Sequence, residues 1–188
     1  MKYIICKVDD VNEKELAFLY SFLPKSRKNK VDQIKIQKNK EISIISYFMV
    51  KKLLNLKKIL DFSYTKNGKP YIKNKPYFNI SHSKNIIVVA CDEKPIGVDI
   101  QEIIPYSEKL ANYICNKKEL KQIKTSKNKN NELTKLWVKK ESYIKLKGKT
   151  ICCDLKKVLN KNSIYNFKIK KYENNYICFC QKKSNFVS

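Results

Sequence analysis

The stretch IIVVACDEKPIGVDI, residues 86–100, decides the fold class. It contains two short apolar runs rich in β-branched residues, Ile86–Cys91 and Ile96–Ile100. Such runs are typical of strands, and the charged residues and proline that separate them favour a turn. We therefore predict that the two strands pair as a hairpin.

The residues before this stretch change from an extended to a helical pattern. Lys2–Val8 is strand-like, and the apolar residues of Val11–Leu23 have helical spacing up to Pro24, which ends that helix. After a basic stretch from Arg27 to Lys40, apolar residues recur at three- and four-residue steps over 42–56, as in a helix with one buried face. These patterns predict a strand followed by two helices.

The residues after the stretch predict two more helices and another hairpin. Ser107 is a candidate N-cap for a helix through Ile114, and Glu132–Lys147 has a helical pattern that Gly148 closes. The last two strand-like segments are Ser163–Lys171 and Tyr176–Gln181.

Short helices and hairpins in mixed order, without the long spacing of βαβ units, indicate the α+β class. Strands and helices occur on both sides of residues 93–96, where the pattern is least constrained. We therefore expect an N-terminal half, residues 1–95, and a C-terminal half, residues 96–188, joined in one compact unit.

The strongest compositional feature is a formal net charge of +24 over 188 residues. Lysine and arginine bind phosphate backbones, so the charge alone suggests a nucleic-acid-binding module. However, Arg27 is the only arginine, and base readout favours the bidentate guanidinium. The lysines are also spread over the whole chain among Ile and Asn, which indicates a codon bias. The composition therefore argues against nucleic acid as the partner.

The seven cysteines indicate a reducing compartment. Their number is odd, and they include the adjacent pair Cys152–Cys153 and the pair Cys178 and Cys180, which would share one face of a strand. With no Cys-x-x-Cys and one histidine, the spacing of a zinc site is missing. We expect buried free thiols in a soluble, cytoplasmic protein without a membrane segment, since the first residues lack the apolar stretch of a signal peptide.

One predicted helix carries a candidate chemical group. Trp137, Glu141 and Lys145 are four residues apart and would lie along one face. Glu141 and Lys145 would form a surface salt bridge in one interpretation. In the other interpretation the carboxylate binds a cation and the amine binds a phosphate.

Asp99 stands in an otherwise apolar strand, where a carboxylate is costly unless it has a partner. Either Mg²⁺ or a neighbouring lysine would be such a partner. By strand alternation Gln101 lies on the face of Asp99, and Glu102 lies on the opposite face.

His82 lies between Ser81 and Ser83 at the entry of a strand. A single histidine is commonly a packed or hydrogen-bonded residue. With hydroxyl groups on either side, it is also a candidate ligand of a phosphate oxygen.

Together these segments form four ordered blocks, which are Gly68-Lys69-Pro70, Asn79-x-Ser81-His82-Ser83, Gly97-x-Asp99-x-Gln101, and Trp137-x-x-Lys140-Glu141-Ser142-x-x-Lys145. In order and separation they closely resemble the motifs of the Sfp-type 4'-phosphopantetheinyl transferases. The resemblance spans roughly Arg27 to Lys149 and departs from the family pattern at Gln101, where an acidic residue is usual.

The resemblance implies a fold of two similar α/β halves related by a pseudo-twofold axis, with the active site in the cleft between them. It implies coenzyme A as substrate and Mg²⁺ as cofactor. Asp99 and Glu141 would be metal ligands, with Gln101 a weak ligand or one that acts through water. Glu141 and Lys145 would be catalytic. The residues implied in coenzyme A binding are Arg27, Lys30, Ser43, Lys69, Pro70, Ser81, His82 and Lys145.

The implied activity is transfer of 4'-phosphopantetheine from coenzyme A to a serine of an apo acyl or peptidyl carrier protein, with release of 3',5'-adenosine bisphosphate. Carrier proteins of fatty-acid, polyketide or nonribosomal-peptide synthesis are the implied partners, and the enzyme is expected to be a monomer. Two alternatives stay open. The +24 charge motivates a basic nucleic-acid-binding module, and Gln101 motivates a homologue that binds coenzyme A but transfers weakly.

Overall fold

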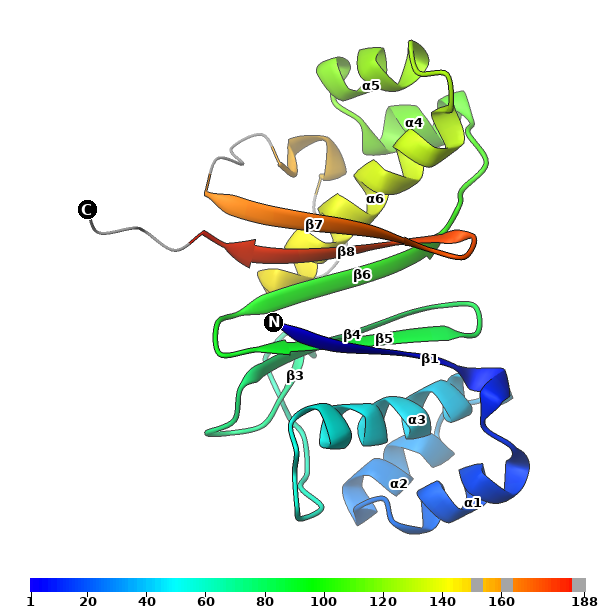
Figure 1. Cartoon of the computed structure of the whole chain (residues 1–188), viewed down its shortest axis with the longest axis vertical. Helices are drawn as coiled ribbons and strands as arrows, with labels where there is room; N and C mark the ends of the chain where they lie inside the picture. The colour runs from blue at the N-terminus through cyan, green and yellow to red at the C-terminus, as the bar shows by residue number, and fades with distance from the viewer. Residues whose placement is uncertain (150–153, 160–163, 184–188) are drawn as a thin grey trace, which may run out of the picture. The chain divides into compact units, whose positions relative to one another are not determined.

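A computed structural model describes residues 1–149, 154–159 and 164–183 (Figure 1). The predicted α+β class is confirmed, since helices and antiparallel sheets occur throughout the described chain. The chain divides into two compact units, unit 1 (Met1–Lys94) and unit 2 (Pro95–Ser188). The halves as domains and the pseudo-twofold relation stay predictions.

Unit 1 is built on a three-stranded antiparallel sheet of order β1-β5-β4. Helix α3 packs on the sheet face that carries Phe78, Ile87 and Val89, and these residues share one core with Ile45 and Met49 of the helix. The elements are β1 (Lys2–Lys7), a 3-10 turn (Val8–Asp10), α1 (Glu13–Ser21), α2 (Lys25–Asp32), α3 (Gln37–Leu53), β2 (Ser63–Tyr64), β3 (Pro70–Tyr71), β4 (Tyr77–Ser83) and β5 (Ile86–Asp92). Strands β2 and β3 form a small separate hairpin.

Unit 2 is built on a second three-stranded antiparallel sheet, of order β6-β8-β7. Its elements are β6 (Ile96–Glu102), α4 (Glu108–Ile114), α5 (Lys117–Lys124), α6 (Lys129–Leu146), a 3-10 turn (Leu155–Lys157), β7 (Tyr165–Tyr172) and β8 (Asn175–Lys182). Helix α6 lies directly against β6. A Cβ atom on Gly97 would come within 2.0 Å of the Ser142 carbonyl oxygen, so only glycine permits this approach.

The predicted hairpin of residues 86–91 and 96–100 is wrong, although both runs are strands. Strand β5 is the central strand of its sheet, with one edge paired to β1 and the other to β4. Strand β6 pairs with β8, more than 70 residues further along the chain. β-branched composition predicts a strand but does not select its partner.

Local signals at the helix ends were better predictors. The Ser107 side chain accepts a hydrogen bond from the Leu110 N–H and caps α4, as predicted. Gly148 follows α6 with a φ of 60°, in the left-handed region that suits a helix end. The sequence interpretation missed α2 and α5, which are short and rich in lysine.

Five cysteines are described as free thiols, and four of these are buried. Cys178 packs with Val138 and Tyr176, and burial raises the pKa of both Cys178 and Cys180 to about 12. These two thiols are therefore core residues and poor nucleophiles. Cys152 and Cys153 lie outside the described residues. None of the described helices has the length and hydropathy needed to span a membrane.

Candidate active site

In unit 2, strand β6 and helix α6 bring together the predicted catalytic residues. Gly97 and Asp99 lie on the face of β6 that meets α6. Asp99 is 5% exposed, and its Oδ1 accepts a hydrogen bond from Lys145 Nζ at 2.7 Å. A neighbouring lysine is therefore a partner of the buried Asp99, which was one of the two partners considered from the sequence.

Glu141 lies one turn before Lys145 on α6 and is only 3% exposed. Burial, together with the negative charge of Asp99, raises the pKa of Glu141 to about 7, and the Lys145 charge opposes this shift. Its Oε1 is buried, and no described residue hydrogen-bonds to it. The surface salt bridge between Glu141 and Lys145 is thus wrong, because Glu141 is not at the surface and Lys145 contacts Asp99.

These residues fit a hard cation. Two buried carboxylates lie near one ammonium group, so the cluster has an excess of negative charge when both acids are ionised, and none of the described residues donates to Glu141 Oε1. Among the described residues, no group of three His, Cys, Asp or Glu side chains is close enough to form a metal site alone. Mg²⁺ suits this arrangement, since it commonly takes one or two carboxylates and completes its shell with water and substrate phosphate.

Gln101 follows Asp99 on the same face of β6 and is partly exposed. Its side chain is neutral, so it adds an oxygen ligand without adding charge. Glu102 points to the opposite face, where its Oε1 accepts a hydrogen bond from Asn174 Nδ2 at 3.5 Å. Glu102 therefore does not replace the missing acid at position 101.

Lys140, the residue before Glu141, is completely buried. Its Nζ donates to the Ile114 carbonyl at 2.8 Å, the Leu155 carbonyl at 2.8 Å and Glu119 Oε2 at 2.7 Å. All three donors of the ammonium group are therefore used. Lys140 joins α6 to the end of α4, the start of α5 and the segment after α6, and so fixes the helix that carries Glu141.

In unit 1, a pocket of about 370 Å³ collects several predicted coenzyme A residues. Arg27, Ser43 and His82 line it. The Arg27 guanidinium donates to the Ser43 carbonyl at 3.0 Å and to Ser43 Oγ at 2.9 Å, while Arg27 Nη1 donates to the Tyr64 hydroxyl at 2.9 Å. A fixed cation beside hydroxyl groups is an anion-binding arrangement.

Tyr64 connects this pocket to the Gly-Lys-Pro turn. It lies opposite Pro70 in the β2–β3 hairpin, and Lys30 Nζ lies 3.3 Å from the centroid of its ring. Gly68 takes a φ of 78° in the turn, and the Lys69 N–H donates to Thr65 Oγ1 at 3.1 Å. Burial lowers the pKa of Lys69 to about 8. The hairpin thus brings Lys69 and Pro70 to the segment that holds Arg27 and Lys30.

Ser81 and His82 are consecutive in β4 and point to opposite faces. His82 is exposed and lies beside Ile80 in the wall of the pocket, whereas Ser81 is 3% exposed and does not line it. Of the predicted pair, only His82 is placed with Arg27 and Ser43.

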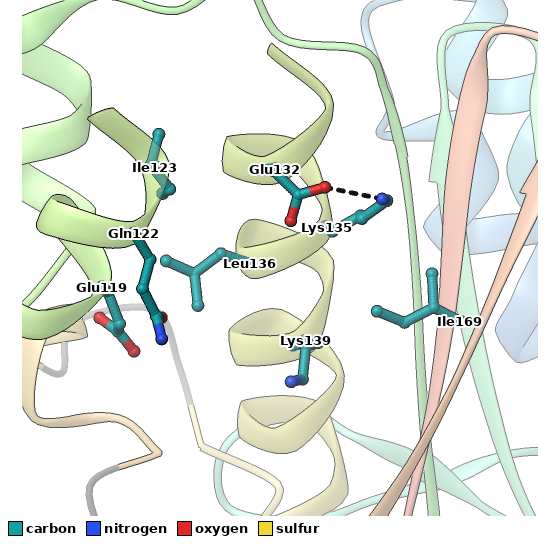
Figure 2. A pocket seen from close by; sticks show the side chains of 8 residues that line it. All are labelled: Glu119, Gln122, Ile123, Glu132, Lys135, Leu136, Lys139 and Ile169. Carbon is teal, nitrogen blue, oxygen red and sulfur yellow. Dashed lines mark hydrogen bonds and ion pairs between the residues drawn. The ribbon is translucent and has the colours of Figure 1, made fainter. Parts of the chain in front are cut away.

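A second pocket, of about 220 Å³, lies on unit 2 between α5, α6 and β7. Figure 2 shows Glu132 and Lys135 paired across one turn of α6, and the Nζ–Oε1 distance is 2.8 Å. Lys139 Nζ lies 5.3 Å from the centroid of the Phe167 ring, and Glu119 accepts from Lys140. The described charged side chains of this pocket already have partners. The pocket therefore offers no cation for an anionic ligand, unlike the pocket around Arg27.

The sequence interpretation missed Ser46, which lines the unit 1 pocket, and Tyr64, which binds the pocket residue Arg27, and it gave Lys140 no role. Tyr64 had no local signal, because its contacts come from residues more than 30 positions away. Ser46 lies one helical turn after Ser43, and that spacing would have placed both hydroxyls on one face of α3. Lys140 was visible in the motif, but only the structure shows its burial.

Comparison with known proteins matches residues 95–185 to the 4'-phosphopantetheinyl transferase superfamily. The chain is similar to the 4'-phosphopantetheinyl transferase ffp of Bacillus subtilis, at 29% identity over 77% of this chain and 69% of the relative. It is 28% identical, with the same coverage, to the 4'-phosphopantetheinyl transferase Sfp of Bacillus subtilis strain 168. A further 4'-phosphopantetheinyl transferase of Bacillus subtilis is 38% identical over 51% of this chain and 45% of the relative.

Residues 95–185 thus match the 4'-phosphopantetheinyl transferase superfamily, and the chain is similar to the transferases ffp and Sfp over 77% of its length. This similarity agrees with the four motif blocks, which resemble those of the Sfp-type enzymes. The predicted family and enzyme class are confirmed by these matches. The roles of individual residues stay predictions.

Proposed function

We propose that the protein transfers the 4'-phosphopantetheine group of coenzyme A to a serine of an apo acyl or peptidyl carrier protein, with Mg²⁺ as cofactor. The observation that carries this proposal is the cluster of the buried Asp99 and Glu141 with the partly buried Lys145, in which a carboxylate oxygen of Glu141 has no described donor. Such a cluster suits a metal-bound pyrophosphate better than it suits an isolated core.

Asp99 and Glu141 would hold the cation, with Gln101 as a weak ligand or one that acts through water. When bound there, Mg²⁺ would neutralise charge on the phosphoryl oxygens. Lys145, already aligned by Asp99, would bind the pyrophosphate and stabilise the charge that grows on it.

The reaction is a displacement at the β-phosphorus of coenzyme A. The serine Oγ of the carrier protein forms a bond to that phosphorus, while the bond from phosphorus to the bridging oxygen breaks. The electron pair leaves with 3',5'-adenosine bisphosphate, and the serine proton passes to Glu141, directly or through water. Glu141 suits this role because burial and Asp99 bring its pKa to about 7.

The remaining predicted contacts would bind the rest of coenzyme A. The Arg27, Ser43 and His82 pocket suits the 3'-phosphate, and Lys30 would add positive charge to it. Lys69 and Pro70 would lie near the adenine. Ser81 would contact a phosphate from the other face of β4.

Several wider expectations belong to the same proposal. The protein would act as a cytoplasmic monomer, without binding nucleic acid, and its two units would be related by a pseudo-twofold axis. A basic chain also suits an acidic carrier protein, since charge complementarity speeds association.

The decisive experiment incubates the purified protein with coenzyme A, Mg²⁺ and several apo carrier proteins, followed by mass spectrometry. We expect one carrier to gain the mass of one phosphopantetheine. If no carrier gains that mass, the transferase proposal fails. Binding of coenzyme A without transfer would instead support a weak homologue, which the neutral Gln101 in the metal site favours as the second candidate.

A further inference from the structure

Ser46 is an unexplained buried polar residue in the wall of the unit 1 pocket. It is 4% exposed, and its Oγ has no hydrogen-bond partner among the described residues. A buried hydroxyl without a partner costs about 1–3 kcal/mol, so such groups are rare unless something else satisfies them. Ser46 belongs to none of the four motif blocks.

The position of Ser46 on α3 relates it to the pocket. Asn39, Ile42, Ser43 and Ser46 are spaced by three or four residues, which places them on one face of the helix. All four line the pocket. The hydroxyl of Ser46 therefore stands one turn beyond that of Ser43, which Arg27 already contacts.

A second buried polar atom of the same pocket indicates what kind of ligand would bind the Ser46 hydroxyl. Arg27 Nε is buried, and no described residue accepts its hydrogen. An arginine nitrogen can only donate, and a serine hydroxyl can donate as well. Arg27 Nε and the Ser46 hydroxyl are thus two donors without a described acceptor, and one of them carries positive charge. An anion with several acceptor oxygens would satisfy both. A phosphate monoester has this chemistry.

We propose that the Ser46 hydroxyl is a specificity-determining ligand of a phosphate monoester in this pocket. The hydroxyl reaches the ligand by a change of its χ1 rotamer, which moves no backbone atom. This inference rests on the proposed function, because the 3'-phosphate of coenzyme A is the monoester that the pocket would bind. Ser46 thus adds recognition of the 3'-phosphate beyond that of Arg27 and Ser43.

The test compares the wild-type protein with Ser46→Ala, using coenzyme A and 3'-dephospho-coenzyme A as ligands in isothermal titration calorimetry. A hydrogen bond to a charged group is lost in the variant, so its Kd for coenzyme A should rise about tenfold. Its Kd for 3'-dephospho-coenzyme A should stay within about twofold of the wild-type value. Equal losses for the two ligands, or no loss for either, would overturn the proposal.

The stability of the ligand-free protein gives an independent readout. Ser46→Ala removes a buried hydroxyl that has no partner in the described part of the chain, so the Tm without ligand should rise by about 2–4 °C. Binding and stability then change in opposite directions, which a simple packing role would not produce. A fall of the Tm would mean that the hydroxyl has a structural partner, and this would also overturn the proposal.

Ser21→Ala is the matched control. The Ser21 hydroxyl donates to the Phe18 carbonyl within α1, outside the pocket, so this variant should change neither Kd. The assays also separate the two proposals. If the 3'-phosphate binds in a way that depends on Ser46 but no carrier protein is modified, the Ser46 proposal holds and the transferase proposal fails. If a carrier protein is modified but Ser46→Ala discriminates between coenzyme A and 3'-dephospho-coenzyme A as the wild-type protein does, the transferase proposal holds and the Ser46 proposal fails.

Discussion

In unit 1 strand β1 is followed by three α-helices and then by the antiparallel strands β4 and β5, and in unit 2 strand β6 is followed by three α-helices and then by β7 and β8. In both sheets the last strand of the unit lies in the centre, between the first strand and the preceding one. Apart from the small β2–β3 hairpin of unit 1, the described parts of the two units therefore share one order of helices and sheet strands, although the sequence showed no repeat.

The two long helices also share a buried polar side chain. Tyr47 lies six residues before the last residue of α3, and Lys140 lies six residues before the last residue of α6. The Tyr47 hydroxyl donates to the Leu60 carbonyl at 2.9 Å and accepts from the Leu60 N–H at 3.2 Å. Lys140 contacts the Leu155 carbonyl in the segment after α6. In both units this side chain fixes the segment that follows the helix.

The units differ in charge. The buried link is a neutral phenol in unit 1 and an ammonium group in unit 2, and the candidate sites have opposite signs. Arg27 and serine hydroxyls form an anion pocket in unit 1, whereas Asp99 and Glu141 form an acidic cluster in unit 2. One order of elements thus accommodates candidate sites of either charge, and the charge is set by a few side chains of the helices and of strand β6.

Removal of the acidic charge of unit 2 should have the largest effect. In Glu141→Gln the cation ligand and the proton acceptor are both lost, and we expect transfer to fall by about 10²–10⁴-fold. Stability should not fall, because the folded state holds the Glu141 pKa above its usual value and so disfavours the ionised form at neutral pH. Mass spectrometry of the carrier and thermal melting measure the two effects. A fully active variant would remove Glu141 from the mechanism.

The neutral Tyr47 side chain and the charged Lys140 side chain, which bind the segments after α3 and α6, should differ in their contribution to stability. Lys140→Met leaves Glu119 partly buried without its cation and should cost about 3–5 kcal/mol. Tyr47→Phe removes hydrogen bonds of a neutral group and should cost about 1 kcal/mol. Urea denaturation of both variants measures the free energy of unfolding. If both variants lose the same free energy of unfolding, the charge of Lys140 adds nothing to the stability that its hydrogen bonds provide.

Gly97 of unit 2 lies where α6 closely approaches β6, whereas Gly68 of unit 1 has open space around it. In Gly97→Ala the new Cβ meets the backbone of Ser142, so the helix must shift, at a cost of about 1–3 kcal/mol. Gly68→Ala is the control, because it meets no atom within 4 Å and carries only the cost of its φ of 78°, about 1 kcal/mol. Transfer should fall in Gly97→Ala, since the shift separates Asp99 from Lys145. Denaturation and the carrier assay test both outcomes, and a harmless Gly97→Ala would contradict the packing argument.

The sequence predicted elements well where the signal is local. The long helices, the Ser107 cap, the Gly148 helix end and the last hairpin all follow from spacing or from turn residues. Strand pairing was less predictable. The run Ile86–Cys91 was paired with the run that follows it, Ile96–Ile100, whereas β5 pairs with the preceding strand β4 and with β1 from the start of unit 1.

The candidate site was predictable as a set of residues but not as a geometry. The motif spacing placed Glu141 and Lys145 on one helix face, yet it could not show that Lys145 contacts Asp99, 46 positions earlier. Burial was also hidden, because Glu141 and Lys140 look like surface residues in a lysine-rich helix. Tyr64, which binds Arg27 beside the pocket, depends on a tertiary contact that no local pattern contains.

A substitution at Gln101 would change the charge of the proposed metal site more mildly than Glu141→Gln. Gln101→Glu adds a third carboxylate on the face of β6 that carries Asp99, and ligand charge sets much of the affinity for Mg²⁺. The half-saturating Mg²⁺ concentration for transfer should therefore fall several-fold, while the maximal rate changes little. Gln101→Ala should raise that concentration only slightly. An unchanged Mg²⁺ dependence in Gln101→Glu would exclude Gln101 from the metal site.

The smallest expected effect concerns a cation of unit 1. Burial lowers the pKa of Lys69 from 10.5 to about 8, so above pH 8 the folded protein holds this amine largely neutral. An anionic ligand would raise the pKa again, and binding would then take up a proton. The affinity for coenzyme A should accordingly fall as the pH rises from 8 to 10, and calorimetry in buffers of different ionisation enthalpy would detect the uptake. Lys69→Arg, whose side chain stays charged, should lack this decline relative to the wild-type protein. If both proteins show the same pH profile, Lys69 does not contact the ligand, and the anion site of unit 1 is confined to the pocket around Arg27.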